Sequence, residues 1–138
     1  MKNTGIATLF MRLALASGFL SAVASRLGLW GKHSSGWNNF LEYTAQVNSF
    51  LPKSSISTVA IASTCLETGL GILLLIGYKT KYAAFGAALL TLLFAVAMSY
   101  SFGVKEPLDY SVFAFSAGAL LLSTLPGNKW SIDQLLIK

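Results

Sequence analysis

Four apolar runs divide the chain, and they cover approximately residues 5–25, 56–77, 82–102 and 110–125. The first three are each about 20 residues long, the length at which a helix crosses about 30 Å of hydrocarbon. The last run is shorter and lies near the lower limit for a crossing. The pattern therefore predicts an all-α protein, a bundle of four transmembrane helices.

The only long polar stretch, residues 27–55, separates the first two runs. Its first part is rich in Gly and Ser, which indicates a flexible connection. Trp37, Phe40, Leu41 and Val47 then follow helical spacing with polar residues between them. This predicts an amphipathic helix that lies in the membrane interface and ends before Pro52. As an alternative, the same helix folds over the bundle as a lid.

Composition supports a membrane environment. The chain has 138 residues, enough for one domain over 1–138, and it is 54% hydrophobic and 11% charged. Soluble domains carry about 25% charged residues, and a soluble fold of this size could not bury so much apolar surface. The net charge of +5 comes from cations scattered at the ends of the apolar runs. That placement is typical of a bilayer border and argues against nucleic-acid binding.

Four crossings place both termini on one side of the membrane. The basic residues on that side are Lys2, Lys79, Lys81, Lys129 and Lys138. The other side has Arg26, Lys32, Lys53 and Lys105, offset by Glu42, Glu106 and Asp109. The tight basic turn at Lys79 and Lys81 predicts that both termini are cytoplasmic. Lys105 and Asp109 are candidate charged residues of the outer loop.

Two charges lie within the apolar runs, Arg12 in the first and Glu67 in the second. Such charges are costly in a bilayer and usually mark a site or a partner. In antiparallel helices Arg12 would lie roughly 10 Å, and Glu67 roughly 15 Å, from the same membrane face. This predicts a buried Arg12–Glu67 pair, with Ser63 and Thr64 beside it as a candidate ligand site. The alternative has Arg12 extended to the headgroups and Glu67 protonated against Ser63 or Thr64.

Other signals are weaker. Arg12, Phe19 and Arg26 recur every seven residues and so share one helix face. Cys65 and His33 are the sole cysteine and histidine, so neither a disulfide within the chain nor a metal site is predicted. No cofactor is evident, and no catalytic residue can be named.

Three segments together resemble the DoxX family. Met11-Arg-Leu-Ala-Leu-Ala-Ser-Gly18 is similar to its opening helix, and residues 66–84 to its second signature, an acid followed by a Gly-rich Leu run, a turn and an Ala pair. Residues 127–133 resemble its closing motif. The resemblance implies a small four-helix protein of the bacterial inner membrane. It also assigns family-like polar positions to Arg12, Glu67 and Asp133.

Some relatives in that family are subunits of a thiosulfate:quinone oxidoreductase. We therefore expect an accessory subunit of a membrane redox complex, with a quinone as candidate ligand and no catalysis by the chain alone. Two alternatives remain open: a module that binds or transports a lipid, small molecule or proton, and a structural or chaperone-like bundle. The expected partners are the lipid bilayer and either an oxidoreductase subunit or further copies of the chain.

Overall fold

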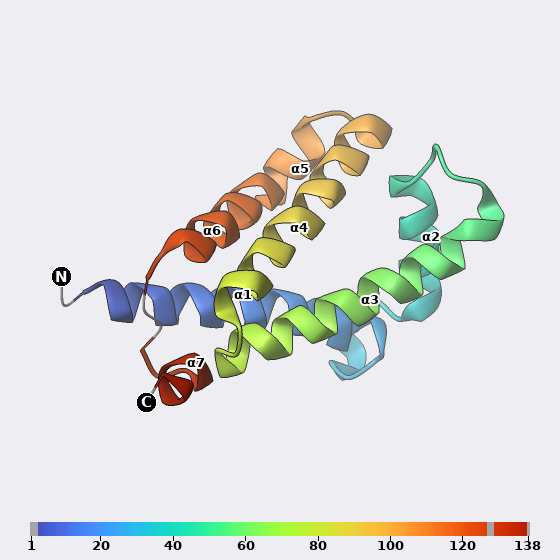
Figure 1. Cartoon of the computed structure of the whole chain (residues 1–138). Coiled ribbons are helices and arrows are strands. Elements are labelled where there is room, and N and C mark those ends of the chain that lie inside the picture. Colours follow the sequence, from blue (N-terminus) through green and yellow to red (C-terminus); the bar gives the residue numbers. More distant parts are fainter. Residues whose placement is uncertain (1–2, 127–128, 138) are drawn as a thin grey trace.

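The computed structural model of the chain describes residues 3–126 and 129–137, and most of these are helical (Figure 1). The all-α prediction is therefore confirmed. The elements, in chain order, are α1 (Thr4–Arg26), the one-turn 3-10 helix η1 (Gly31–His33), α2 (Trp37–Val47), α3 (Lys53–Ile76), α4 (Thr80–Phe102), α5 (Lys105–Asp109), α6 (Val112–Thr124) and α7 (Ile132–Leu136).

Three of the described helices, α1, α3 and α4, are long and apolar enough to cross a membrane, and the chain is a multi-pass membrane protein. The fourth predicted span is the apolar helix α6, which has 13 residues. At 1.5 Å per residue α6 measures about 20 Å, less than the hydrocarbon core. It starts later than predicted because Ser111, with a φ of 57°, breaks the helix after α5. A crossing by α6 therefore stays a prediction.

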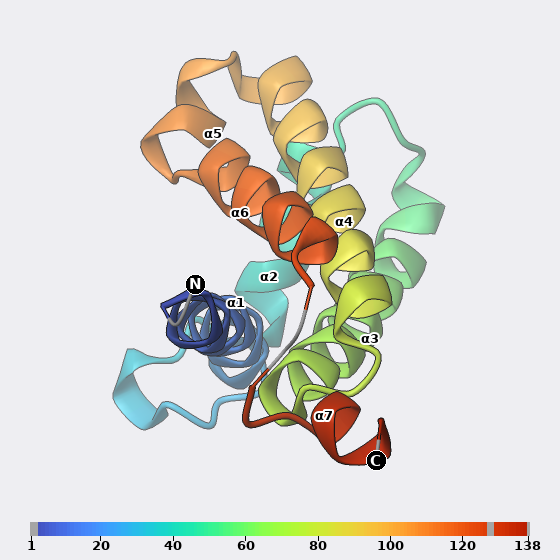
Figure 2. The same ribbon diagram turned by 60° about the vertical axis from the view of Figure 1, so that its left-hand side comes forward.

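The four apolar helices form two packed pairs, α1 with α3 and α4 with α6. Figure 2 looks nearly along α1 and shows α4 and α6 side by side. The buried face of α4 is largely alanine, and small residues let transmembrane helices approach closely. The core joins both pairs through Leu15 and Phe19 of α1, Leu74 of α3, and Leu122 of α6. Large apolar side chains such as Phe10 and Leu93 point outward, as expected where lipid is the solvent.

Both ends of the described chain lie at one end of the bundle (Figure 1). The start of α1, the turn between α3 and α4, the segment after α6, and α7 line one groove there. This arrangement agrees with termini on a common side, although Lys2 and Lys138 lie outside the described residues. Which membrane face this end occupies remains a prediction.

Helix α2 is amphipathic as predicted and packs against α3 and α4. Val47 is buried, while Trp37, Phe40 and Leu41 are half-buried. The Ser101 hydroxyl near the end of α4 donates to the Val47 carbonyl, and the Tyr43 ring stacks on Phe102. The short interfacial helix is therefore confirmed, and its contacts also cover part of the bundle, as in the lid alternative.

Candidate functional site

Arg12 is almost completely buried, with 1% of its surface exposed. Its guanidinium donates four hydrogen bonds, all to backbone carbonyls. Two acceptors lie at the end of α3, Leu74 at 3.0 Å and Leu75 at 3.3 Å. The other two precede α7, Lys129 at 3.1 Å and Trp130 at 3.2 Å. Arg12 therefore joins the first helix to two segments that are distant in sequence.

These contacts suit the chemistry of a helix end. The last four carbonyls of a helix have no partner within the helix, and they form its negative pole. The Arg12 side chain supplies donors and a positive charge to that pole. Gly77, with a φ of 70°, ends α3 directly against the guanidinium, and an added Cβ there would lie 2.8 Å from Arg12 Cζ. Only glycine fits both the conformation and the space.

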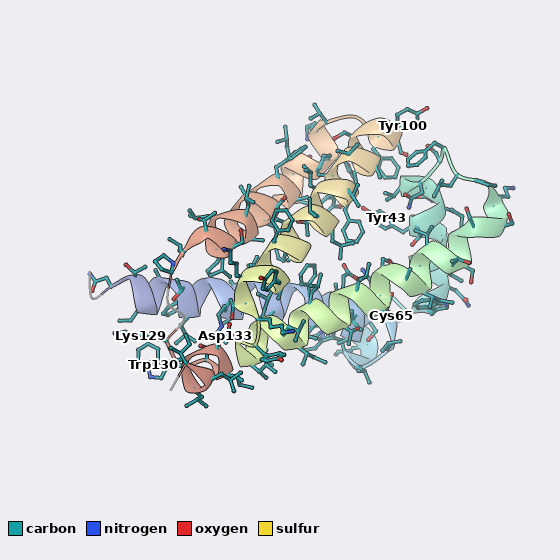
Figure 3. The ribbon with its side chains drawn as sticks, in the orientation of Figure 1. Tyr43, Cys65, Tyr100, Lys129, Trp130 and Asp133 are labelled. Atoms are coloured by element: carbon teal, nitrogen blue, oxygen red, sulfur yellow. The ribbon has the colours of Figure 1, made fainter. Side chains whose placement is uncertain are left out.

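Asp133 completes the same structure from the C-terminal segment. Its carboxylate accepts hydrogen bonds from the backbone N–H groups of Lys79 at 2.6 Å and Thr80 at 2.8 Å, at the start of α4. Its own N–H donates to the Gly77 carbonyl at 2.9 Å. Figure 3 shows Lys129, Trp130 and Asp133 gathered beside the end of α3. We call Arg12, Gly77 and Asp133, with the backbone of residues 129–130, the C-terminal latch.

The latch affects the acidity of Asp133. Partial burial alone would raise the pKa of this carboxyl, but the Thr80 and Lys79 donors and the charge of Arg12 outweigh burial, so the pKa lies below its ordinary value. The carboxylate is thus held in its charged form, which also suits its place at the positive N-terminal pole of α4.

Glu67 does not pair with Arg12, and the predicted Arg12–Glu67 pair is wrong in this respect. Glu67 is 4% exposed and forms an ion pair with Nη1 of Arg26 at the other end of α1. The same Nη1 donates to the Thr64 hydroxyl at 3.1 Å. The Phe40 ring of α2 lies over the guanidinium, with its centre 3.8 Å from Arg26 Cζ. Three helices therefore meet at one buried pair of charges.

Helix geometry explains the different partner. Helices α1 and α3 are antiparallel, with Arg12 beside Gly77, Phe19 beside Gly71 and Arg26 beside Thr64. Side chains of a helix lean toward its N-terminus. Arg12 therefore leans toward the end of the bundle, away from Glu67, whereas Arg26 leans inward toward it. The recurrence of Arg12, Phe19 and Arg26 every seven residues was the available signal, because it places both arginines on the face that meets α3.

A cavity of about 110 Å³ adjoins the pair, and we call it the Arg26–Glu67 cavity. Its volume is roughly that of three or four water molecules, and it is smaller than the cavities of about 150 Å³ that bind benzene. Helix α2 contributes four of its nine lining residues, and Asn48, directly after α2, is a fifth from the same segment. The lining residues are Arg26, Phe40, Tyr43, Thr44, Val47, Asn48, Glu67, Phe94 and Met98.

The other predicted site residues lie at varied distances from this cavity. Thr64 contacts Arg26, but the buried Ser63 hydroxyl donates to the Ala60 carbonyl of its own helix at 3.1 Å. The Trp37 ring packs 5.6 Å from that of Phe40, and Leu41 is half-buried beside it in sequence. Thr64 therefore adjoins the Arg26–Glu67 pair, whereas Ser63 bonds within α3, and Trp37 and Leu41 contribute to the packing of α2.

Lys105 and Asp109 form an exposed ion pair with each other in α5 and do not line the cavity. Sequence reasoning missed Tyr43, Thr44 and Met98 as lining residues. Thr44 lies one helical turn after Phe40 on the same face, which was the available signal. Among residues 3–126 and 129–137, no three His, Cys, Asp or Glu side chains are grouped so that they could hold a metal ion.

Comparison with known proteins gives one family. The family model described as methylamine utilisation protein MauE matches residues 4–125. No curated protein and no solved structure matches the chain. The chain therefore belongs to the MauE family. This is a DoxX-related family, so the resemblance led to a related family and not to the matching one itself.

Proposed function

We propose that this protein is an accessory membrane subunit of a redox system for methylamine utilisation, in the inner membrane of a bacterium. The match of the MauE family model over residues 4–125 carries the proposal. Use of an amine as a nutrient requires cleavage of its C–N bond, and an oxidative route delivers electrons to a carrier. Such steps are carried by cofactors or redox-active groups. This chain has one cysteine and no nucleotide or flavin fingerprint, so we assign the redox groups to a partner subunit.

Within this role we assign different tasks to the two buried arginines. Arg12 is structural, because its guanidinium donates its hydrogen bonds to four backbone carbonyls. Arg26 and Glu67 form the working site, because they adjoin a cavity and are covered by a separate short helix. A buried ion pair is costly unless it is well satisfied, which favours a use for these charges beyond holding helices together.

The size of the cavity limits what it can receive. A substituted quinone ring is larger than benzene, and the cavity of about 110 Å³ is smaller than a benzene-binding cavity. The space beside Glu67, as the structure has it, is thus small for a quinone ring, and we assign a quinone no step. Water, a proton or a small polar solute fits. This favours, as the second candidate function, a module that binds or passes such a small species beside Glu67.

The test is growth on methylamine as the sole nitrogen source after deletion of the gene. We expect the deletion to abolish that growth and the wild-type gene to restore it. Glu67→Gln should fail to restore it although the protein reaches the membrane. Lys105→Gln with Asp109→Asn is the matched control, since it neutralises an exposed ion pair outside the cavity. This control should restore growth fully.

Purification supplies the second readout. The protein extracted in mild detergent from cells grown on methylamine should carry an oxidoreductase subunit, identified by mass spectrometry. Isolation without such a partner, together with normal growth of the deletion strain, would contradict the proposal. Loss of growth without any co-purified subunit would favour the small-solute module instead.

A further inference from the structure

A groove of about 790 Å³ opens at the end of the bundle that holds the C-terminal latch. It lies between the first turn of α1, the start of α4, the segment after α6, and α7. Its walls include the apolar side chains of Tyr82, Leu125 and Ile137. Three lysines line the same groove: Lys79, Lys81 and Lys129. The groove thus combines apolar walls with three cationic side chains.

The positive charge of the groove is not neutralised within the described chain. All three lysines are exposed, and none forms an ion pair with a described residue. Among the described lining residues the one acid is Asp133, whose two oxygens accept hydrogen bonds from the backbone at the start of α4. The groove therefore offers cations to an anion from outside.

One lysine is positioned by the fold. A Cβ added to Gly5 would lie 2.5 Å from Cδ of Lys129, so the stem of Lys129 lies directly on the first turn of α1. A larger residue than glycine would displace it. In the turn between α3 and α4, the Lys79 ammonium lies 5.7 Å from the centre of the Tyr78 ring. The first of these contacts places a cation beside the start of α1.

The level of the groove relative to the membrane indicates which kind of molecule it binds. Helices α1 and α4 begin here, at the point where membrane-crossing helices leave the hydrocarbon. Tyr82 is 74% exposed and Trp130 62%, and aromatic side chains of this kind concentrate at the headgroup level. Ile137, 85% exposed, adds apolar surface on which an acyl chain can pack. A molecule with a phosphate group and an acyl chain can bind both the lysines and the apolar walls of the groove.

We propose that this groove binds an anionic phospholipid, with its phosphate between Lys79, Lys81 and Lys129 and an acyl chain along the apolar walls. A basic pocket between transmembrane helices at the headgroup level is the expected receptor for such a lipid. The site is separate from the Arg26–Glu67 cavity and does not depend on the function proposed above. A bound lipid would also cover the C-terminal latch from the membrane side.

The test measures lipids retained by the protein in native mass spectrometry after release from nanodiscs. The wild-type protein should retain phosphatidylglycerol in preference to phosphatidylcholine. Each lysine near a membrane surface contributes about 1 kcal/mol, or about fivefold in affinity. Replacing Lys79, Lys81 and Lys129 together by Gln should therefore weaken phosphatidylglycerol binding about 100-fold. Lys32→Gln with Lys53→Gln, at the opposite end, is the matched control and should change it little.

Three results would overturn the proposal: equal retention of the two lipids by the wild type, equal loss in the control variant, or full phosphatidylglycerol binding by the triple Gln variant. Should the triple Gln variant fail to fold, the same three positions changed to Arg must keep the binding, and loss there would also refute it. Displacement of the lipid by millimolar inorganic phosphate would assign the lysines to a free anion instead.

Discussion

The C-terminal latch yields the prediction with the largest effect on stability. Arg12→Met keeps an apolar stem of similar length and removes a guanidinium that donates four hydrogen bonds to backbone carbonyls. A side-chain hydrogen bond in a membrane protein contributes about 0.6–1.7 kcal/mol, and one to a charged group can reach about 3 kcal/mol. At about 1 kcal/mol each, the four bonds predict a loss of about 4 kcal/mol. Arg12→Lys keeps the positive charge but not the planar guanidinium with its several N–H donors. It should therefore lower the free energy of unfolding by about half as much as Arg12→Met.

The assay is reversible unfolding in mixed detergent micelles, followed by circular dichroism. Lys53→Met is the control, because it removes an exposed cation at the start of α3 and should change the free energy of unfolding by less than about 0.5 kcal/mol. Hydrogen exchange should locate the loss in residues 129–137 and in the last turn of α3. A loss below about 1 kcal/mol for Arg12→Met, or unchanged exchange in those segments, would refute the role assigned to Arg12.

Three further predictions concern the latch and the lid. Gly77→Ala should destabilise the fold by at least about 2 kcal/mol, since it puts a Cβ on a residue with φ of 70° and against the guanidinium; a neutral effect would contradict the packing. Because the pKa of Asp133 is lowered in the fold, its contribution is present above about pH 4 and is lost as pH falls further, through the folded pKa. Hydrogen exchange of residues 129–137 should rise over that range, and Asp133→Asn should remove the pH dependence. Phe40→Leu removes the ring over Arg26 and should cost about 1–2 kcal/mol in the unfolding assay, whereas the outward-facing Phe10→Leu should cost less than about 0.5 kcal/mol.

Much of the fold was predictable from the sequence, because hydrophobic run length and helical spacing are local properties. The predicted first span, residues 5–25, matches α1 at Thr4–Arg26 closely. The amphipathic helix beginning at Trp37 was also found, although its packing on α3 and α4 was only an alternative. The extent of the last span was less predictable, since a single left-handed residue, Ser111, decides where α6 begins.

The candidate site was harder to predict, because it depends on side-chain direction and on contacts between distant segments. Arg12 and Glu67 are both buried, as their places in apolar runs predict. Depth along the helix axis does not include the lean of helical side chains toward the N-terminus, and depth alone therefore pairs Glu67 with the wrong arginine. The acceptors of Arg12 include backbone carbonyls of residues 129 and 130, and no pattern in the sequence marks a carbonyl as an acceptor.

The corrected pairing is the central structural claim, and a pair of double-mutant cycles tests it most directly. One cycle combines Glu67→Gln with Arg26→Gln, and the other combines Glu67→Gln with Arg12→Gln, with the free energy of unfolding as the readout. Contacting charges couple by about 0.5–3 kcal/mol, whereas separate sites add within about 0.5 kcal/mol. Arg12 contacts α3 about seven residues, or roughly 10 Å, beyond Glu67. We therefore expect a coupling of at least about 1 kcal/mol for Arg26–Glu67 and none above about 0.5 kcal/mol for Arg12–Glu67. The reverse order would contradict the account.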